Sequence, residues 1–173
     1  MSLRAFNTFG IDAKADAYLP IESVAQLTAL REDASLARLP RLLLGGGSNI
    51  VLTGDFHGLV LHSCSRGIAM IDQQGDTVRV RAAAGEAWQT LVDWSLQHQL
   101  AGLENLSLIP GSVGAAPIQN IGAYGAEVAS TIDAVTVFDF DSGACADAWR
   151  ARRGSLPVFQ PQAPGGWLGR ELG

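Results

Sequence analysis

The chain from Gly102 to Gly125 reads GLENLSLIPGSVGAAPIQNIGAYG. Glu104 is the one charged residue in it, so the segment is too apolar for a solvated loop. Its glycines and prolines nevertheless exclude a long helix or a regular strand. Buried irregular backbone needs partners for its amides and carbonyls, and a flat ligand with polar edges would supply them. The segment therefore predicts a bound cofactor, with an unusual core loop as the alternative.

A second glycine-rich stretch, Gly45-Gly46-Gly47-Ser48-Asn49, follows a short apolar run at residues 41–44. Successive glycines let backbone amides turn toward one point and admit an anion that a Cβ would otherwise block. Ser48 and Asn49 add side-chain donors, so the loop suits a pyrophosphate. A plain glycine-rich hairpin is the alternative, because short glycine runs are common in turns.

Two common phosphate-binding motifs do not fit this loop. A dinucleotide-binding fingerprint would have its third glycine where Ile50 stands, and would open a helix rather than the β-type run at residues 50–52. A P-loop would carry a lysine directly after its glycines, and this loop has none. Neither of those nucleotide-binding folds is predicted.

The periodicity of the remaining chain indicates a mixed α+β fold in which strands outnumber helices. A helix is expected at residues 22–31, where Ser23 and Gln26 form a capping box and Val24, Leu27 and Thr28 share a face. A second helix after Gly85 carries one apolar stripe, formed by Trp88, Leu91, Val92, Ser95 and Leu96. Strands are expected at residues 41–44, 58–62, 68–71, 77–83 and 131–140, the last of them stopping at the turn Asp141-Ser142-Gly143.

Composition and charge exclude several classes of protein. The 173 residues suffice for one domain or two small lobes. The net charge of −5 is scattered, so no basic surface for nucleic acid is expected. No window approaches the ~18 apolar residues of a membrane span, and Met1 to Gly10 lack a signal-peptide core. Cys64 and Cys145 have no metal-type spacing, so we expect no metal site and two free, buried thiols in a reducing cytoplasm.

The order of the motifs resembles the UDP-N-acetylenolpyruvoylglucosamine reductase family. The matching blocks are Asn7-Thr8-Phe9-Gly10, the run from Leu44 to Asn49, Gly85-Glu86-Ala87-Trp88, and the long block that ends at Gly125. The resemblance covers residues 3–143. It implies an FAD-binding fold of the vanillyl-alcohol-oxidase type, in which two α+β lobes clasp FAD. The first lobe would be residues 1–56, and residues 57–143 would be a partial second lobe, incomplete at the C-terminus.

The resemblance assigns cofactor contacts to both glycine-rich stretches. The first loop would hold the FAD pyrophosphate, and the later block would line the flavin ring and the phosphate side. The residues carried over as cofactor-binding are Gly45, Gly46, Gly47, Ser48, Asn49, Ile50, Pro110, Gly111, Ser112, Gly114, Ala115, Gln119, Asn120, Gly122 and Ala123. Tyr124 is carried over as substrate-binding, and Asn7 and Thr8 as a segment near the cofactor. Because the first loop has no histidine, FAD is expected to bind non-covalently.

The implied reaction is the reduction of UDP-N-acetylglucosamine enolpyruvate to UDP-N-acetylmuramate in peptidoglycan biosynthesis. NADPH would reduce the FAD, and the reduced flavin would then reduce this small nucleotide-sugar substrate. The alternative is a non-catalytic flavin-binding module, or a fragment that needs a partner chain. Absorbance of flavin without bleaching by NADPH would favour the module.

The resemblance ends near residue 143, after which Arg, Pro, Gly and Trp replace the patterned elements. Three residues that do the family's non-flavin chemistry, an Arg in a Tyr-Arg-x-Ser stretch, a Ser and a late Glu, would lie beyond this point. Arg150, Arg152, Arg153 and Ser155 lack that context, so no catalytic residue is assigned. We expect residues 144–173 to be an irregular tail, translated out of frame or following a premature fusion or stop, without a substrate domain. Such a chain would be inactive and marginally stable, and would bind FAD weakly.

Overall fold

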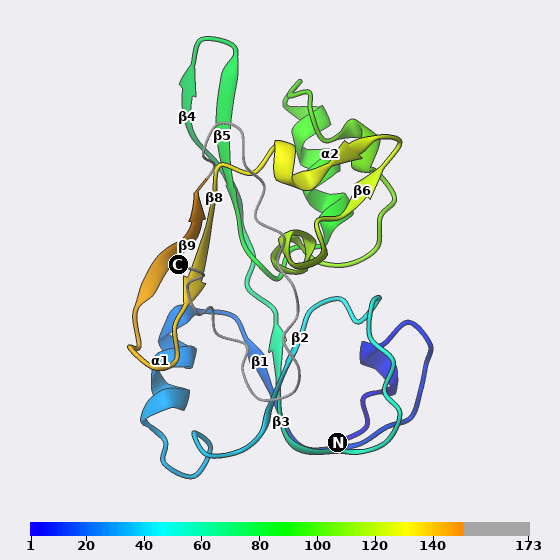
Figure 1. Ribbon diagram of the computed structural model, residues 1–173, viewed down its shortest axis with the longest axis vertical. Coiled ribbons are helices and arrows are strands. Elements are labelled where there is room, and N and C mark those ends of the chain that lie inside the picture. Colours follow the sequence, from blue (N-terminus) through cyan, green and yellow to red (C-terminus); the bar gives the residue numbers. More distant parts are fainter. Residues whose placement is uncertain (151–173) are drawn as a thin grey trace, which may run out of the picture.

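The computed structural model describes residues 1–150, which form an α+β arrangement around a small parallel sheet (Figure 1). This first sheet contains β1 (Ala15–Ile21), β2 (Arg41–Leu44) and β3 (Phe56–Ser63) in the order β1-β3-β2. Leu59, Val60 and Leu61 of the central strand are all buried, as expected for a parallel strand covered on both faces. The central strand thus continues past residue 56, where the first lobe was expected to end.

Helix α1 (Val24–Glu32) covers one face of the first sheet. The Gln26 side-chain oxygen accepts hydrogen bonds from the backbone N–H groups of Glu22 and Ser23, which is the return half of the expected capping box. Leu30 is the buried contact, whereas Val24 is 51% exposed. The expected buried face was therefore wrong at Val24, because the helix turns Leu27 and Leu30 toward the sheet.

Two short segments of the first sheet differ from the sequence expectation. No strand was predicted at residues 15–21, where β1 forms. Its Pro20 is tolerated because β1 lies at the edge of the sheet. Residues 50–52, expected as a β-type run, form no strand, and Ile50 and Leu52 instead pack against the core of the sheet.

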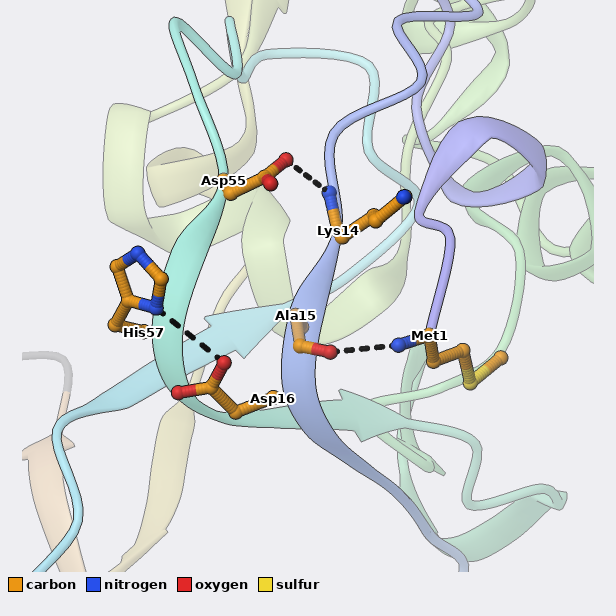
Figure 2. Close-up of polar contacts among 6 residues, drawn as sticks. All are labelled: Met1, Lys14, Ala15, Asp16, Asp55 and His57. Carbon is orange, nitrogen blue, oxygen red and sulfur yellow. Dashed lines mark hydrogen bonds and ion pairs between the residues drawn. The ribbon is translucent and has the colours of Figure 1, made fainter.

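The start of the first sheet is tied to the N-terminal segment (Figure 2). The amino group of Met1 donates to the Ala15 carbonyl at 2.6 Å, and the Lys14 amide donates to the Asp55 carboxylate at 2.8 Å. An exposed hydrogen bond of 3.3 Å joins His57 Nδ1 and Asp16 Oδ1 on the neighbouring strands. These contacts fix the path of residues 1–14 beside the sheet.

The second core gathers around α2 (Trp88–Gln97), at the upper right of Figure 1. Four residues of the expected stripe are buried: Trp88, Leu91, Val92 and Ser95. Leu96 is 51% exposed, so it does not belong to the buried face as expected. The antiparallel hairpin of β4 (Ile68–Gln74) and β5 (Thr77–Ala82) packs its base on this core. Its valines are half-buried and its arginines exposed, which is the alternation of a half-buried strand, and the strand expected at residues 77–83 is confirmed.

Irregular backbone fills the segment from Gly102 to Gly125, as expected. It contains two 3-10 turns, η2 (Glu104–Leu106) and η3 (Val113–Gln119), and the strand β6 (Gly122–Ala123). Strand β6 pairs with β7 (Ala126–Glu127), which directly follows the segment. The turn η4 (Val128–Ser130) follows, and η1 (Arg4–Phe6) is the corresponding turn near the N-terminus. Apolar residues of the segment, among them Leu106, Ala116 and Ile121, complete the core around α2.

Strand pairing continues past residue 143, which corrects the expectation of an irregular tail from residue 144. Strand β8 (Ala134–Phe138) turns at Gly143, where φ is +74°, into β9 (Cys145–Arg150). The two strands are antiparallel, with Phe138 opposite Cys145 and Ala134 opposite Arg150. Pairing with β8 makes β9 a strand although its own sequence has little apolar alternation. Arg152, Arg153 and Ser155 lie outside the described residues.

The cysteines and helices of the described part add two further observations. Cys64 is half-buried and Cys145 is exposed, so the expectation that both thiols are buried is wrong. Within residues 1–150, no helix combines the length and the apolar character that crossing a membrane requires.

Candidate functional site

The first glycine loop leaves β2 and turns against the N-terminal segment. Gly47 has φ +66°, and a Cβ added there would lie 2.9 Å from the Asn7 Cα, so the position needs glycine. The backbone amide of Thr8 donates to the Gly47 carbonyl at 3.0 Å. Asn7 is buried and donates to the carbonyls of Leu3 and Ile11, at 2.8 Å and 2.9 Å. Its amide thus holds in place the segment on which the loop rests.

The loop approaches the segment around Gly111 backbone to backbone, although 65 residues separate Gly46 from Gly111 in the chain. A Cβ added at Gly46 would lie 3.0 Å from the Gly111 Cα. One added at Gly45 would lie 2.6 Å from the Ser112 Oγ. Asn49 and Gln119 are joined by a side-chain hydrogen bond across the same junction. The structure therefore brings together the two stretches that the sequence singled out.

Ser112 stands at this junction with an unused hydroxyl. The residue is 6% exposed, and within residues 1–150 its Oγ is the buried side-chain polar atom without a hydrogen-bond partner. A buried hydroxyl without a partner costs about 1–3 kcal/mol, so an acceptor from outside the chain would recover that energy. A phosphate oxygen of FAD is such an acceptor. The orphaned hydroxyl and the small glycines beside it fit a diphosphate bound at this junction.

A third stretch holds the second one in position. The Val113 amide donates to the Glu86 carbonyl at 2.9 Å, and the Trp88 amide donates to the Gly111 carbonyl at 3.0 Å. A Cβ added at Gly114 would lie 2.6 Å from the Cβ of Ala84, so only glycine allows this approach. Residues 84–88 were not among the predicted site residues, although their glycine motif was a visible signal in the sequence.

Several residues predicted to bind the cofactor make hydrogen bonds or packing contacts within the protein itself. The Asn120 side chain donates to Glu127 at 2.8 Å and accepts from the Ala129 amide at 3.1 Å. Gly122 and Ala123 belong to β6 and pair with β7. The side chain of Ile50 packs into the core of the first sheet, so only its backbone is available to a ligand. These four residues support the walls of the site, and contact with a cofactor remains a prediction for them.

Two apolar side chains next to the site are exposed and held in left-handed backbone. Tyr124 is 92% exposed with φ +53°, and Leu108 is 86% exposed with φ +64°. This conformation costs a residue other than glycine roughly 1–2 kcal/mol. Tyr124 follows β6 directly, so the predicted substrate-binding residue extends from a tight turn into solvent. Pro110 is also exposed, whereas Ala115 is half-buried and would lie 3.5 Å from a Cβ added at Gly45.

One residue near the first loop was missed by sequence reasoning. His62 pairs in register with Leu44, the residue before the loop, and its Nδ1 lies 2.6 Å from the Tyr18 hydroxyl. Burial and the charge of Arg66 lower the pKa of His62, although a hydrogen bond with the Gly45 backbone acts in the opposite direction. Burial also raises the pKa of Tyr18. The sequence spacing gives no sign that His62 lies near the first loop. The parallel pairing of β2 with β3 places it there.

The other two histidines lie away from this junction. His57 is exposed beside Asp16, and His98 is exposed at the end of α2, where its ring stacks on Trp94 with 3.9 Å between centroids. In the described part of the chain, no group of three or more His, Cys, Asp or Glu residues is placed to hold a metal ion.

Comparison with known proteins gives a consistent family assignment. Residues 15–148 match the family model described as FAD binding domain. UDP-N-acetylenolpyruvoylglucosamine reductase of Paraburkholderia xenovorans is 50% identical over 159 residues, covering 91% of this chain and 46% of that protein. The enzyme of the same name from Pseudomonas aeruginosa is 46% identical over 172 residues, covering 96% of this chain and 50% of that protein.

A solved structure agrees with these relatives. The crystal structure of UDP-N-acetylenolpyruvylglucosamine reductase from Thermus caldophilus has a TM-score of 0.65 and 26% identity, and the match covers 85% of this chain and 50% of that one. The predicted flavin-binding α+β fold is thereby confirmed.

The extent of these matches corrects one expectation. The chain spans about half the length of the curated relatives it matches. A match over 96% of the chain is more than residues 1–143 can provide, so the similarity does not end at residue 143. The hypothesis of a frameshift there loses its motivation. The chain belongs to the FAD binding domain family, and the relatives reported above carry the name UDP-N-acetylenolpyruvoylglucosamine reductase.

Proposed function

We propose that this chain is the FAD-binding part of an NADPH-dependent reductase that converts UDP-N-acetylglucosamine enolpyruvate to UDP-N-acetylmuramate. The reaction would serve peptidoglycan synthesis in the cytoplasm. The observation that carries the proposal is the buried, unpartnered hydroxyl of Ser112 at the junction of the two glycine-rich stretches. The names and coverage of the relatives support the same substrate and reaction.

Each of the two glycine-rich stretches would bind a different part of FAD. Residues 45–49 would receive the diphosphate, because their glycines leave backbone amides accessible and none of them is charged. Ser112 would donate its hydroxyl to a phosphate oxygen, and the backbone of residues 110–115 would lie along the flavin. No covalent attachment is proposed, since the loop offers no histidine. Tyr124 would meet the nucleotide sugar from the turn after β6.

The chemistry that FAD supplies when bound is hydride transfer, from NADPH to the enolpyruvyl group of the substrate. The described residues bind and orient, and we assign none of them a proton-transfer role. The second candidate is a flavin-binding module that needs a partner chain to catalyse. The observation that favours it is that the chain spans about half the length of its relatives.

A matched pair of glycine variants tests the proposal. Gly46→Ala would push its Cβ against the Gly111 backbone, whereas nothing lies within 4 Å of a Cβ at Gly54 in the same connection. We expect Gly46→Ala to weaken FAD binding about ten-fold, which corresponds to about 1.4 kcal/mol, and Gly54→Ala to leave it unchanged. Quenching of FAD fluorescence measures both affinities.

Adding NADPH to the FAD-loaded chain and recording the flavin absorbance separates the two candidate functions. Bleaching of bound flavin by NADPH supports the reductase, and a stable flavin spectrum in NADPH supports the binding module. If the unmodified chain does not quench FAD fluorescence at any attainable concentration, the proposed function fails.

A further inference from the structure

The connection from β3 to β4, residues 64–67, leads the chain from the first sheet to the core around α2 (Figure 1). The Gly67 amide donates to one carboxylate oxygen of Glu86 at 2.7 Å, and the Arg66 guanidinium lies 3.6 Å from the other oxygen. The Glu86 side chain is 13% exposed, so little water competes for these contacts. A hydrogen bond to an ionised acceptor is roughly twice as strong as a neutral one. The Glu86 carboxylate therefore holds the connection in place.

Residue 85 adds further contacts with the same connection. The Arg66 guanidinium donates to the Gly85 carbonyl, and the Gly85 amide donates to the Ser65 Oγ at 3.2 Å. A Cβ added at Gly85 would lie 2.5 Å from the Ser65 backbone nitrogen, so the two backbones are in direct contact here. Ser65, Arg66 and Gly67 thus all contact residues 85–86.

The backbone of Glu86 contacts the second glycine-rich stretch. Its carbonyl accepts from the Val113 amide at 2.9 Å, and the next residue, Ala87, forms an antiparallel bridge with Ser112. Glu86 is therefore in contact with the connection from the first sheet through its side chain and with the neighbour of Ser112 through its backbone. This residue relates the position of the Ser112 hydroxyl to the first sheet, from which the first glycine loop extends.

We propose that Glu86 is a positioning residue that, through its hydrogen bond with Gly67, keeps the Ser112 hydroxyl within reach of a diphosphate bound at the first glycine loop. The inference rests on the proposed function, because it assumes that the junction receives the FAD diphosphate. Glu86 itself is not assigned any contact with the ligand, since both of its carboxylate oxygens face the connection.

The two sides of the junction belong to different cores, which is why the spacing between them needs to be held. Residues 45–49 follow β2 of the first sheet, whereas Val113 packs on the core around α2. A hydroxyl donates to an oxygen over about 2.5–3.0 Å, so a separation of the cores by about 0.5 Å would lengthen such a bond beyond this range. The backbone contact of Gly46 with Gly111 prevents a closer approach, and the contact of Glu86 with Gly67 would prevent separation.

The proposed role depends on the length of the side chain at residue 86 and not on its charge. The Gly67 amide can donate to a neutral amide oxygen as it does to a carboxylate, whereas a side chain shorter by one methylene would not reach it. The ion pair with Arg66 contributes little by itself, because the arginine side chain is 62% exposed. Glu86→Gln should therefore keep the proposed role, and Glu86→Asp should lose it.

The FAD affinities of these two variants, measured by quenching of FAD fluorescence, test the inference. We expect Glu86→Gln to bind FAD within about two-fold of the unmodified chain, and Glu86→Asp to bind it roughly five- to ten-fold more weakly. Asp72→Ala is the control, since it removes a carboxylate that is paired with Arg79 in the β4–β5 hairpin, and it should leave FAD affinity unchanged. Unchanged affinity in Glu86→Asp, or equal weakening in both variants of Glu86, overturns the inference.

A double-mutant cycle with Ser112→Ala tests whether Glu86 acts through the serine. If it does, Glu86→Asp should weaken FAD binding by less than about two-fold once the hydroxyl is absent. Fully additive losses would overturn the inference while the proposed function stands. Absence of FAD binding by the unmodified chain overturns both.

Discussion

Ser112 and Ser95 show how differently two buried serine hydroxyls can be used. The Ser95 Oγ donates to the Val92 carbonyl at 2.8 Å and is satisfied inside its own helix. The Ser112 Oγ has no such partner within the described residues, although Ser112 is as buried as Ser95. An unsatisfied buried hydroxyl is a cost to the unliganded protein, which a ligand can turn into binding energy.

Replacing Ser112 by alanine should therefore change stability and affinity in opposite directions. Without ligand, Ser112→Ala should unfold at an equal or higher urea concentration, with a gain of up to about 1 kcal/mol, because an unpaired hydroxyl is removed. FAD binding should weaken roughly 10- to 100-fold, the value of a hydrogen bond to a charged group. Urea unfolding and FAD fluorescence measure the two effects.

Ser95→Ala is the matched control, since it removes a buried hydroxyl that is already paired within α2. Its FAD affinity should equal that of the unmodified chain. If Ser112→Ala instead destabilised the unliganded protein and left FAD affinity intact, the hydroxyl would form its hydrogen bond within the protein and not with FAD.

Two arginines, Arg31 of α1 and Arg41 of β2, contact the turn between β8 and β9. This turn lies beside α1 at the lower left of Figure 1. Arg31 donates to the carbonyls of Phe140 and Asp141, at 2.8 Å and 2.9 Å. The Arg41 guanidinium lies 4.5 Å from the centre of the Phe140 ring. These contacts link the turn of the hairpin to α1 and to the edge strand β2 of the first sheet.

Arg31→Met keeps much of the aliphatic stem but removes the donors, so the hairpin should open more often. We expect amides of β8 and β9 to exchange with solvent about five-fold faster, equivalent to the loss of about 1 kcal/mol. Arg38→Met changes an exposed arginine close by in the sequence and should leave exchange unchanged. Equal exchange in both variants would show that Phe140 packing alone holds the hairpin.

Local signals in the sequence predicted some elements well and others poorly. The capping residue Gln26 and the stripe from Trp88 to Ser95 located both helices, because these interactions lie within one or two turns. Strands β1 and β9 were missed because no local interaction marks them as strands. Pro20 is acceptable only at a sheet edge, and β9 is a strand only because β8 pairs with it. Such partners are distant in the sequence or depend on topology.

At the scale of the whole molecule, the site is a meeting of segments that are far apart in the chain. Composition marked the loop at Gly46 and the segment at Gly111 as unusual, and the family resemblance linked both to one cofactor. The backbone approach between them, the free hydroxyl of Ser112 and the neighbourhood of His62 required the structure. The parallel sheet determines these positions, because it directs the end of β2 toward the core around α2.

Hydrogen exchange with and without FAD tests most directly whether the two glycine-rich stretches hold one flavin nucleotide. FAD should slow exchange in residues 45–49 and in residues 110–115 together, at the same FAD concentration. The β4–β5 hairpin, which takes no part in the proposed site, should exchange at the same rate in both samples. Protection of only one stretch, or of neither while FAD is bound, would contradict the account.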